Sequence, residues 1–108
     1  MSSIADLQKL VVDFSTSRGW NVYNTPKSLS MSIAIEAAEI MEHYQWVQND
    51  EKLDPARVEE VALECVDVLW YMLRLAEAEG IDLEAAFKKK AAINEGRFPP
   101  QIGRPGRR

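Results

Sequence analysis

The sequence predicts an all-α fold, a small bundle of four helices, on three observations. Helix start and stop signals divide the chain into segments of helical length. No stretch shows the strict apolar–polar alternation of a half-buried strand, and no internal repeat or domain boundary interrupts the pattern. Apolar residues recur at helical spacing in the first segment, at Ile4, Leu7, Leu10, Val11 and Phe14. The class is therefore all-α, in one domain.

The first helix is predicted over residues 3–18, and Gly19 ends it because glycine breaks helices. The segment that follows is rich in asparagine and contains a proline, which predicts a loop. A second helix is predicted to start near Ser28 or Ser30, since either serine can act as its N-cap, and to run to about Gln48.

The third helix has the clearest boundaries. A polar connection, residues 49–54, ends in Asp54, whose carboxylate can cap a helix that begins at Pro55. This helix is predicted to run to Glu79 and to stop at Gly80. Its second half is apolar all round, which requires burial on more than one side.

The last part of the chain contains a fourth helix and a tail. Asp82 is predicted to cap this helix, which ends near Asn94. From Gly96 onward the chain is rich in Gly, Pro and Arg and lacks apolar periodicity, which predicts an extended or mobile end. We therefore predict one domain over residues 1–99 and a mobile basic tail over residues 100–108.

Size and composition narrow the function classes. At 108 residues the chain can form one core, but its third helix needs more neighbours than three other short helices supply, so a homodimer or homotetramer is predicted. The net charge of −4 argues against binding to a nucleic acid polymer. The single cysteine, Cys65, is interpreted as a reduced core residue. The sequence lacks a signal-peptide pattern and an apolar run of membrane-spanning length, which predicts a cytoplasmic protein without membrane contact.

Two pairs of carboxylates are three residues apart in apolar surroundings, Glu36 with Glu39 and Glu64 with Asp67. Residues at this spacing lie on one face of a helix, and like charges beside an apolar core are costly unless they are neutralised. If the second and third helices pack antiparallel, the four carboxylates converge. An all-oxygen set without imidazole suits Mg²⁺, with Mn²⁺ as a substitute, rather than zinc. Because Mg²⁺ often shares its shell with substrate phosphates, a phosphorylated ligand is expected.

Other interpretations of these residues remain open. All four acids could be exposed surface charges, as glutamate commonly is on helices. A carboxylate-bridged di-iron site needs Glu-x-x-His on two helices, whereas the single histidine, His43, follows Glu39 by four residues. His43 is therefore interpreted as a surface or interface residue. Among the tryptophans, Trp20 and Trp46 are candidates for stacking on a base, and Trp70 is assigned to the core or to a subunit interface.

The two acidic motifs, Glu36-Ala37-Ala38-Glu39 and Glu64-Cys65-Val66-Asp67, resemble the ExxE…ExxD metal motif of the MazG-like, all-α nucleoside triphosphate pyrophosphohydrolases. The likeness covers about residues 4–99 and is strongest with the dCTP pyrophosphatase branch. Four further segments are similar to that branch: Trp20–Leu29, Gln45–Trp46, Asp67–Tyr71 and Lys90–Pro99.

This resemblance implies Mg²⁺-dependent hydrolysis of a nucleoside triphosphate to the monophosphate and pyrophosphate, in the house-cleaning of the nucleotide pool. The expected substrate is dCTP or a related or modified pyrimidine nucleotide. The implied metal ligands are Glu36, Glu39, Glu64 and Asp67. The implied substrate-binding residues are Trp20, Lys27, Trp46, Tyr71, Lys90, Asn94 and Arg97.

Chemistry of this kind needs a carboxylate that orients or deprotonates water, and we select Glu39 for that catalytic role. Two positions depart from the family pattern. Asn24 stands where the relatives carry a histidine, and Leu63 stands where many members carry another acid. Two other functions remain open. One is the same fold acting on dUTP or phosphoribosyl-ATP, and the other is a non-enzymatic helical dimerisation module whose acidic face binds a basic partner.

Overall fold

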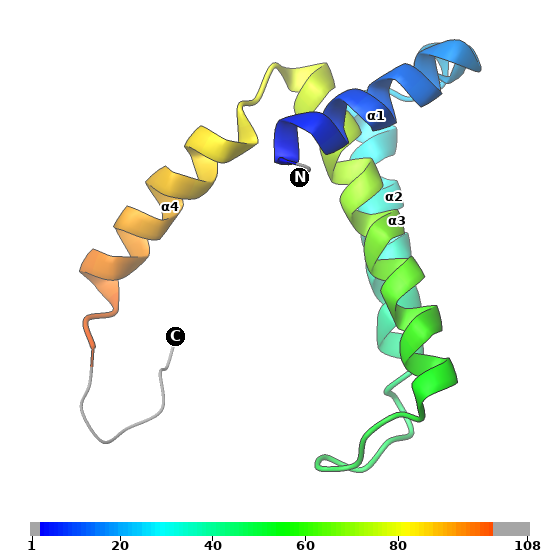
Figure 1. Cartoon of the computed structure of the whole chain (residues 1–108), viewed down its shortest axis with the longest axis vertical. Helices are drawn as coiled ribbons and strands as arrows, with labels where there is room; N and C mark the ends of the chain where they lie inside the picture. Colours follow the sequence, from blue (N-terminus) through cyan, green and yellow to red (C-terminus); the bar gives the residue numbers. More distant parts are fainter. Residues whose placement is uncertain (1–2, 101–108) are drawn as a thin grey trace.

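The computed structural model describes residues 3–100, which form helices joined by short connections (Figure 1). The elements, in chain order, are α1 (Ile4–Ser17), the short 3-10 helix η1 (Trp20–Val22), α2 (Pro26–Glu42), α3 (Pro55–Glu79) and α4 (Leu83–Arg97). No strand occurs in this part of the chain. The prediction of an all-α fold with four helices is therefore confirmed.

Local capping signals account for the helix ends that were predicted correctly. The carboxylate of Asp54 accepts a hydrogen bond from the backbone N–H of Arg57 at 2.9 Å, which satisfies one of the free donors at the start of α3. Gly19 and Gly80 end α1 and α3 in the left-handed backbone region, with φ of 67° and 65°. A side chain would be strained there, so glycine is the residue that fits.

Helix α2 differs from its prediction at both ends. It begins at Pro26 rather than near Ser28 or Ser30, because Thr25 is the N-cap and accepts from the backbone N–H of Ser28 at 3.2 Å. It ends at Glu42 and not at Gln48. After Glu42 the backbone hydrogen bonds span three residues instead of four, so the chain tightens into turns.

Helix α4 begins where it was predicted, with Asp82 accepting from the backbone N–H of Ala85 at 3.0 Å. It continues past Asn94 and through Gly96 to Arg97, so the prediction that the tail starts at Gly96 is wrong. The helix stops before the pair Pro99–Pro100, because a proline disfavours helical backbone in the residue that precedes it. Most of the predicted tail, residues 101–108, lies outside the described residues.

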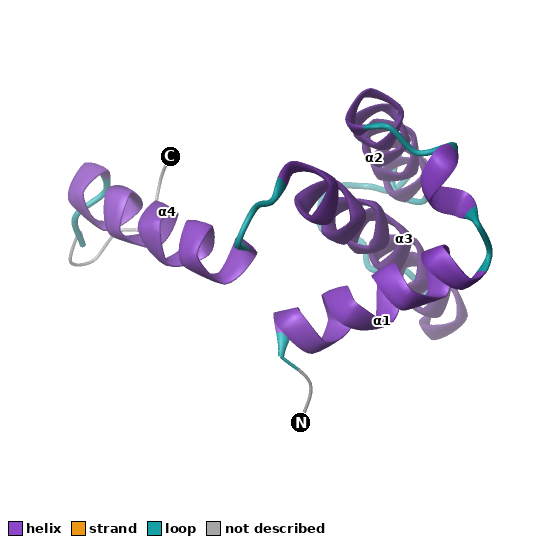
Figure 2. Cartoon of the chain, turned by 90° about the horizontal axis from the view of Figure 1, so that it is seen from above, coloured by secondary structure: helices purple, strands orange, loops and turns teal. Residues whose placement is uncertain are grey.

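The helices form an elongated arrangement. Helices α2 and α3 lie side by side and antiparallel, and α1 crosses them near the end of α3 (Figure 1). The view from above shows α4 leading away from these three helices, and its largest packing contact is a small one with α1 (Figure 2). The radius of gyration is 17.1 Å, compared with about 13 Å for a compact domain of this length.

The core lies where α1, the start of α2 and the second half of α3 meet. Its buried apolar side chains are Val11, Leu29, Leu73 and Ala76. Ser15 is fully buried beside them and satisfies its hydroxyl by donating to the carbonyl of Val11 at 2.9 Å. Many large apolar side chains outside this core are exposed.

Cys65 is also exposed, so its assignment to the core is wrong for the single chain. It lies on α3 away from the point where α1 crosses. None of the helices described is both long enough and apolar enough to cross a membrane.

Candidate functional site

The antiparallel packing of α2 and α3 brings the two acidic motifs into one electrostatic field. Glu36, Glu39 and Glu64 are half-buried, and Asp67 is exposed. The pKa of the Glu36 carboxyl is raised above its usual value, first because its side chain hydrogen-bonds to Glu39, and further by burial and by the negative charges of Glu39, Asp67 and Glu64. The charges of Glu39, Glu64 and Asp67 therefore act on Glu36 within one field that spans the helix pair, as the spacing and the antiparallel packing predict.

The carboxylates approach one another without forming a closed set of ligands. Within residues 3–100, no three or more Asp, Glu, His or Cys side chains converge closely enough to hold a metal ion. One oxygen of the cluster is nevertheless in an unusual state. Glu64 Oε2 is shielded from solvent, and Nε2 of His43 is its close polar neighbour in the described part of the chain. Since hard divalent cations prefer carboxylate oxygens and would offset the negative field at Glu36, the residues present fit such a cation.

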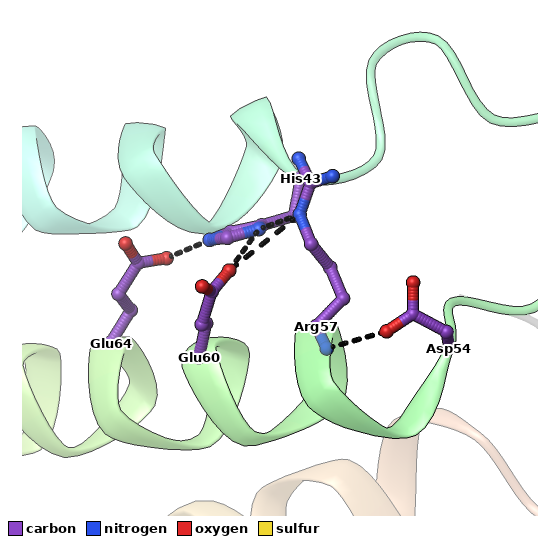
Figure 3. Close-up of polar contacts among 5 residues, drawn as sticks. All are labelled: His43, Asp54, Arg57, Glu60 and Glu64. Atoms are coloured by element: carbon purple, nitrogen blue, oxygen red, sulfur yellow. Dashed lines mark hydrogen bonds and ion pairs between the residues drawn. The ribbon is translucent and has the colours of Figure 1, made fainter.

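His43 and Arg57 hold the Glu64 end of the cluster (Figure 3). The Nε of Arg57, in the first turn of α3, donates to Nδ1 of His43 at 2.7 Å. The other ring nitrogen of His43, Nε2, lies 2.6 Å from Glu64 Oε2. His43 therefore links the end of α2 to α3 and gives the shielded Glu64 oxygen a close polar neighbour. The exposed Glu60 lies further from both residues, at 4.0 Å from His43 Nδ1 and 3.8 Å from Arg57 Nε.

The sequence interpretation of His43 as a surface or interface residue missed this contact. Its side chain is only 12% exposed. The available signal was the helix geometry, since His43 lies four residues after Glu39 and so on the same side of the chain as the acids. Arg57 had no signal of its own, because only the closure of the connection between α2 and α3 brings it to His43.

The predicted aromatic residues lie in two separate places. Trp20 and Tyr71 line one hollow, of about 320 Å³, at the start of α2. Trp46 is largely exposed and lines a second hollow, of about 490 Å³, which also contacts Glu39 and Glu64. The two hollows lie at opposite ends of α2, which at 17 residues is about 25 Å long. Within one chain, these aromatic residues do not form a single base pocket.

The predicted phosphate-binding residues Lys90, Asn94 and Arg97 lie on α4, which leads away from α2 and α3 (Figure 2). One chain therefore does not bring them to the carboxylates. Lys27 is exposed in the first turn of α2 and lines neither hollow. Of the substrate residues, Trp46 alone shares a hollow with the acids.

Trp70 and the two departures from the family pattern also have definite places. Trp70 is half-buried and packs edge-on against Phe14 of α1, with ring centroids 5.3 Å apart, which fits the first of its two predicted places, the core and a subunit interface. Asn24 lies at the same hollow as Trp20 and Tyr71. The side chain of Leu63 is 69% exposed, so in this chain an apolar surface position precedes the second acidic motif.

Glu36→Gln is expected to stabilise the metal-free protein at neutral pH. The raised pKa means that the folded protein favours the protonated carboxyl more than the unfolded chain does. This carboxyl stabilises the folded state fully at pH values below its usual pKa of 4.5. That stabilisation is lost as the pH rises through the raised pKa of the folded protein. Glutamine is neutral at every pH, so in chelator the variant should melt above wild type at neutral pH and level with it in acid.

The control is Glu59→Gln, at an exposed position outside the cluster. It should follow the wild-type melting curve across the pH range. A Glu36→Gln protein that melts below wild type at neutral pH would show that the carboxylates do not repel one another.

Comparison with known proteins connects this arrangement to a group of hydrolases. A pyrophosphatase from Archaeoglobus fulgidus, known from its crystal structure, is 36% identical with a TM-score of 0.84, and the match covers 93% of this chain and 95% of that one. Two curated relatives named dCTP pyrophosphatase 1 match 94% of the chain, that of Mus musculus at 30% identity and that of Homo sapiens at 28%. The chain spans 62% of the length of each of these two relatives. No protein-family model matches the chain.

The fold and the site define a class, the all-α proteins that carry paired carboxylates on two antiparallel helices. The likeness to the pyrophosphatases extends over nearly the whole chain, in sequence as well as in fold. The chain belongs to the MazG-like, all-α nucleoside triphosphate pyrophosphohydrolase family. The family predicted from the acidic motifs is thereby confirmed.

Proposed function

We propose that the protein is a Mg²⁺-dependent pyrophosphohydrolase that converts a nucleoside triphosphate and water to the nucleoside monophosphate and pyrophosphate. The observation that carries this proposal is that the acids of α2 and α3 share one field, in which Glu39, Glu64 and Asp67 together raise the pKa of Glu36. The half-burial of Glu36, Glu39 and Glu64 supports it, since a bound cation would offset the cost of holding these like charges together. The names of the relatives point to dCTP as the substrate, and we extend the proposal to related or modified pyrimidine nucleotides.

Each carboxylate has a part in this mechanism. Glu36, Glu39, Glu64 and Asp67 would hold Mg²⁺, for which Mn²⁺ would substitute, and the bound cation would lower the pKa of a water and screen the phosphate charge. His43 fixes the orientation of the Glu64 carboxylate. Glu39 faces the hollow beside Glu64 and takes the proton from the attacking water. The water oxygen forms a bond to phosphorus as the bridging P–O bond between the α- and β-phosphates breaks, and pyrophosphate leaves.

A second copy of the chain is part of this proposal. The buried core is small, and large apolar side chains on all four α-helices are exposed, among them Leu10, Ile35, Leu63 and Phe87. One chain also leaves Lys90, Asn94 and Arg97 away from the carboxylates. A homodimer or homotetramer would cover the apolar faces and bring these cationic and amide groups to the triphosphate. Sedimentation velocity tests this point, and a monomer at every concentration would contradict it.

The activity is tested by a panel of nucleoside triphosphates with Mg²⁺ and, in parallel, with chelator. We expect equimolar monophosphate and pyrophosphate from dCTP, measured by chromatography together with a pyrophosphate assay. The panel includes dUTP and phosphoribosyl-ATP, and a higher kcat/KM for either would replace dCTP as the substrate. Release of orthophosphate, or no product from any nucleotide, would contradict the proposed reaction. A non-enzymatic dimerisation module would give no product from any nucleotide. Its melting temperature would also not change on adding Mg²⁺ and nucleotide.

The location and remaining partners stay part of the proposal. A substrate drawn from the nucleotide pool is consistent with the predicted cytoplasmic location. The net charge of −4 gives no basic field for a nucleic acid polymer.

A further inference from the structure

Arg74 is a buried cation that the mechanism above does not use. It lies on α3 between the core residues Leu73 and Ala76, and only 7% of its surface is exposed. Burial lowers the pKa of its guanidinium below the usual value. Across residues 3–100, no carboxylate lies within ion-pair distance of it. A buried charge in this condition is costly, so its place in the fold calls for an explanation.

The protein supplies Arg74 with one acceptor. Its Nη2 donates to Asn21 Oδ1 at 3.3 Å, a long hydrogen bond to a residue of η1. A guanidinium carries five N–H donors in a rigid planar fork and accepts nothing. Most of these donors therefore have no protein partner in the described structure, and they suit a ligand that presents hydrogen-bond acceptors.

The surroundings of Arg74 describe such a ligand. The hollow of about 320 Å³ beside it has a volume within the range of small-molecule sites. The lining residues are Trp20, Tyr23, Asn24, Trp70, Tyr71 and Arg74. Four of these six residues are aromatic, so the walls suit a flat ring. Stacking on aromatic side chains does not by itself distinguish one base from another. Discrimination between rings must come from the two polar members, Arg74 and Asn24.

Asn24 complements Arg74. Its Nδ2 donates to the carbonyl of Trp20 at 2.8 Å, which orients the amide and leaves Oδ1 as an acceptor without a donor among residues 3–100. The hollow therefore offers a fork of donors from α3 and an acceptor from the loop before α2. A ring that fits this hollow needs two neighbouring hydrogen-bond acceptors on its edge, for Arg74, and a hydrogen-bond donor beside them, for Asn24.

The hollow also lies in line with the proposed metal site. Asp67, Tyr71 and Arg74 are separated by four and three residues, so they follow one face of α3. Arg74 is seven residues from Asp67, about 10 Å along the helix axis. A nucleotide whose phosphates are held at Asp67 would extend past Tyr71 with its base towards Arg74.

We propose that Arg74 and Asn24 are specificity-determining residues that select cytosine, with the guanidinium donating to O2 and N3 and Asn24 Oδ1 accepting from the 4-amino group. Uracil and thymine present N–H at position 3 towards the guanidinium and a carbonyl at position 4 towards Asn24. Both contacts would then be repulsive. This inference rests on the proposed pyrophosphohydrolase function and adds to it the two residues that would recognise the base.

The test uses the full chain with Arg74→Met, Arg74→Lys and, as a control at an exposed lysine, Lys9→Met. Arg74→Met should lower kcat/KM for dCTP on the order of 10- to 100-fold and change kcat/KM for dTTP less than about threefold. Arg74→Lys keeps the charge but loses the fork, so its preference for dCTP should lie between those of Arg74→Met and wild type. Lys9→Met should match wild type with both substrates.

Two further measurements separate recognition from folding and from catalysis. Removing an unpaired buried charge should leave the melting temperature of Arg74→Met equal to or above that of wild type, whereas an arginine needed for folding would lower it. Binding of dCMP and dTMP, followed by tryptophan fluorescence in chelator, requires no catalysis. Wild type should bind dCMP more tightly, and Arg74→Met should remove the difference. If Arg74→Met does not fold, the ratio measured with Arg74→Lys decides the question.

The two proposals can fail separately. The role of Arg74 would be overturned if Arg74→Met lost kcat/KM equally for dCTP and dTTP, or if wild type bound dCMP and dTMP equally. Neither result would contradict the proposed hydrolysis. Selective dCMP binding that depends on Arg74, in a protein that hydrolyses no triphosphate, would overturn the proposed reaction and support the cytosine pocket.

Discussion

Asp67→Asn is expected to lower kcat for nucleoside triphosphate hydrolysis about a hundredfold or more, with the fold retained. Asp67 is an exposed acid in the cluster, so its carboxylate is accessible to a cation and to substrate phosphates. Asparagine has nearly the same shape but carries no charge, so it weakens the metal and the electrostatic stabilisation of the transition state together. Steady-state kinetics with dCTP at saturating Mg²⁺ measure the effect.

The structural consequence of Asp67→Asn should be the opposite of its effect on activity. Because Asp67 contributes to the repulsion that raises the pKa of Glu36, removing its charge should leave the metal-free protein at least as stable as wild type. Circular dichroism and thermal melts in chelator measure this. Glu59→Gln, which removes an acid outside the cluster, should keep full activity. Unchanged kcat in Asp67→Asn, or an equal loss in Glu59→Gln, would show that the cluster is not the catalytic site.

Removal of divalent cations is expected to abolish hydrolysis completely and to lower the melting temperature. The charges of Glu39, Glu64 and Asp67 raise the pKa of Glu36, so a bound cation would relieve the repulsion that these acids exert on it. At a Mg²⁺ concentration of about 100 times Kd, binding to the folded state alone stabilises it by about 2.7 kcal/mol. Activity assays and melts in a Mg²⁺ titration after chelation measure the two effects.

Two controls make the cation experiment decisive. Mn²⁺ should restore activity, since it accepts the same oxygen ligands. Asp67→Asn should show a smaller rise in melting temperature than wild type at the same Mg²⁺ concentration. Full activity in chelator would contradict the metal site, and an identical rise in both proteins would mean that Mg²⁺ binds elsewhere.

The helix ends show which structural features short stretches of sequence can predict. Asp54 and Gly80 bound α3 where they were predicted to, because an N-cap hydrogen bond and a left-handed glycine involve only neighbouring residues. The start of α2 follows the same rule, because Thr25 caps the helix and Pro26 is its first residue. The prediction had placed this cap at Ser28 or Ser30 instead. The end of α2 had no such signal. There the chain turns at His43, whose side chain contacts residues of α3.

The candidate site divides in the same way. Spacing alone predicted that Glu36 pairs with Glu39 and Glu64 with Asp67, because three-residue separation on a helix has one geometric outcome. The contact of His43 with Glu64 joins residues 21 positions apart in the chain and depends on how two helices pack. Arg74 is a similar case. An arginine within an apolar run is usually found with its charged end in solvent, and only the crossing of α1 and the loop before α2 enclose it.

The sequence by itself determined that the protein is all-α, where its third helix begins and ends, which acids share a helix face and to which family it belongs. These properties depend on interactions between residues close in the chain, or on motifs that recur within one family. The tertiary structure alone decided that α4 leads away from the carboxylates, that Trp20 and Trp46 lie at opposite ends of α2, and that Arg74 is buried beside an aromatic hollow. Each of these depends on apolar surface buried between distant segments, which is non-directional and leaves no local signal in the sequence.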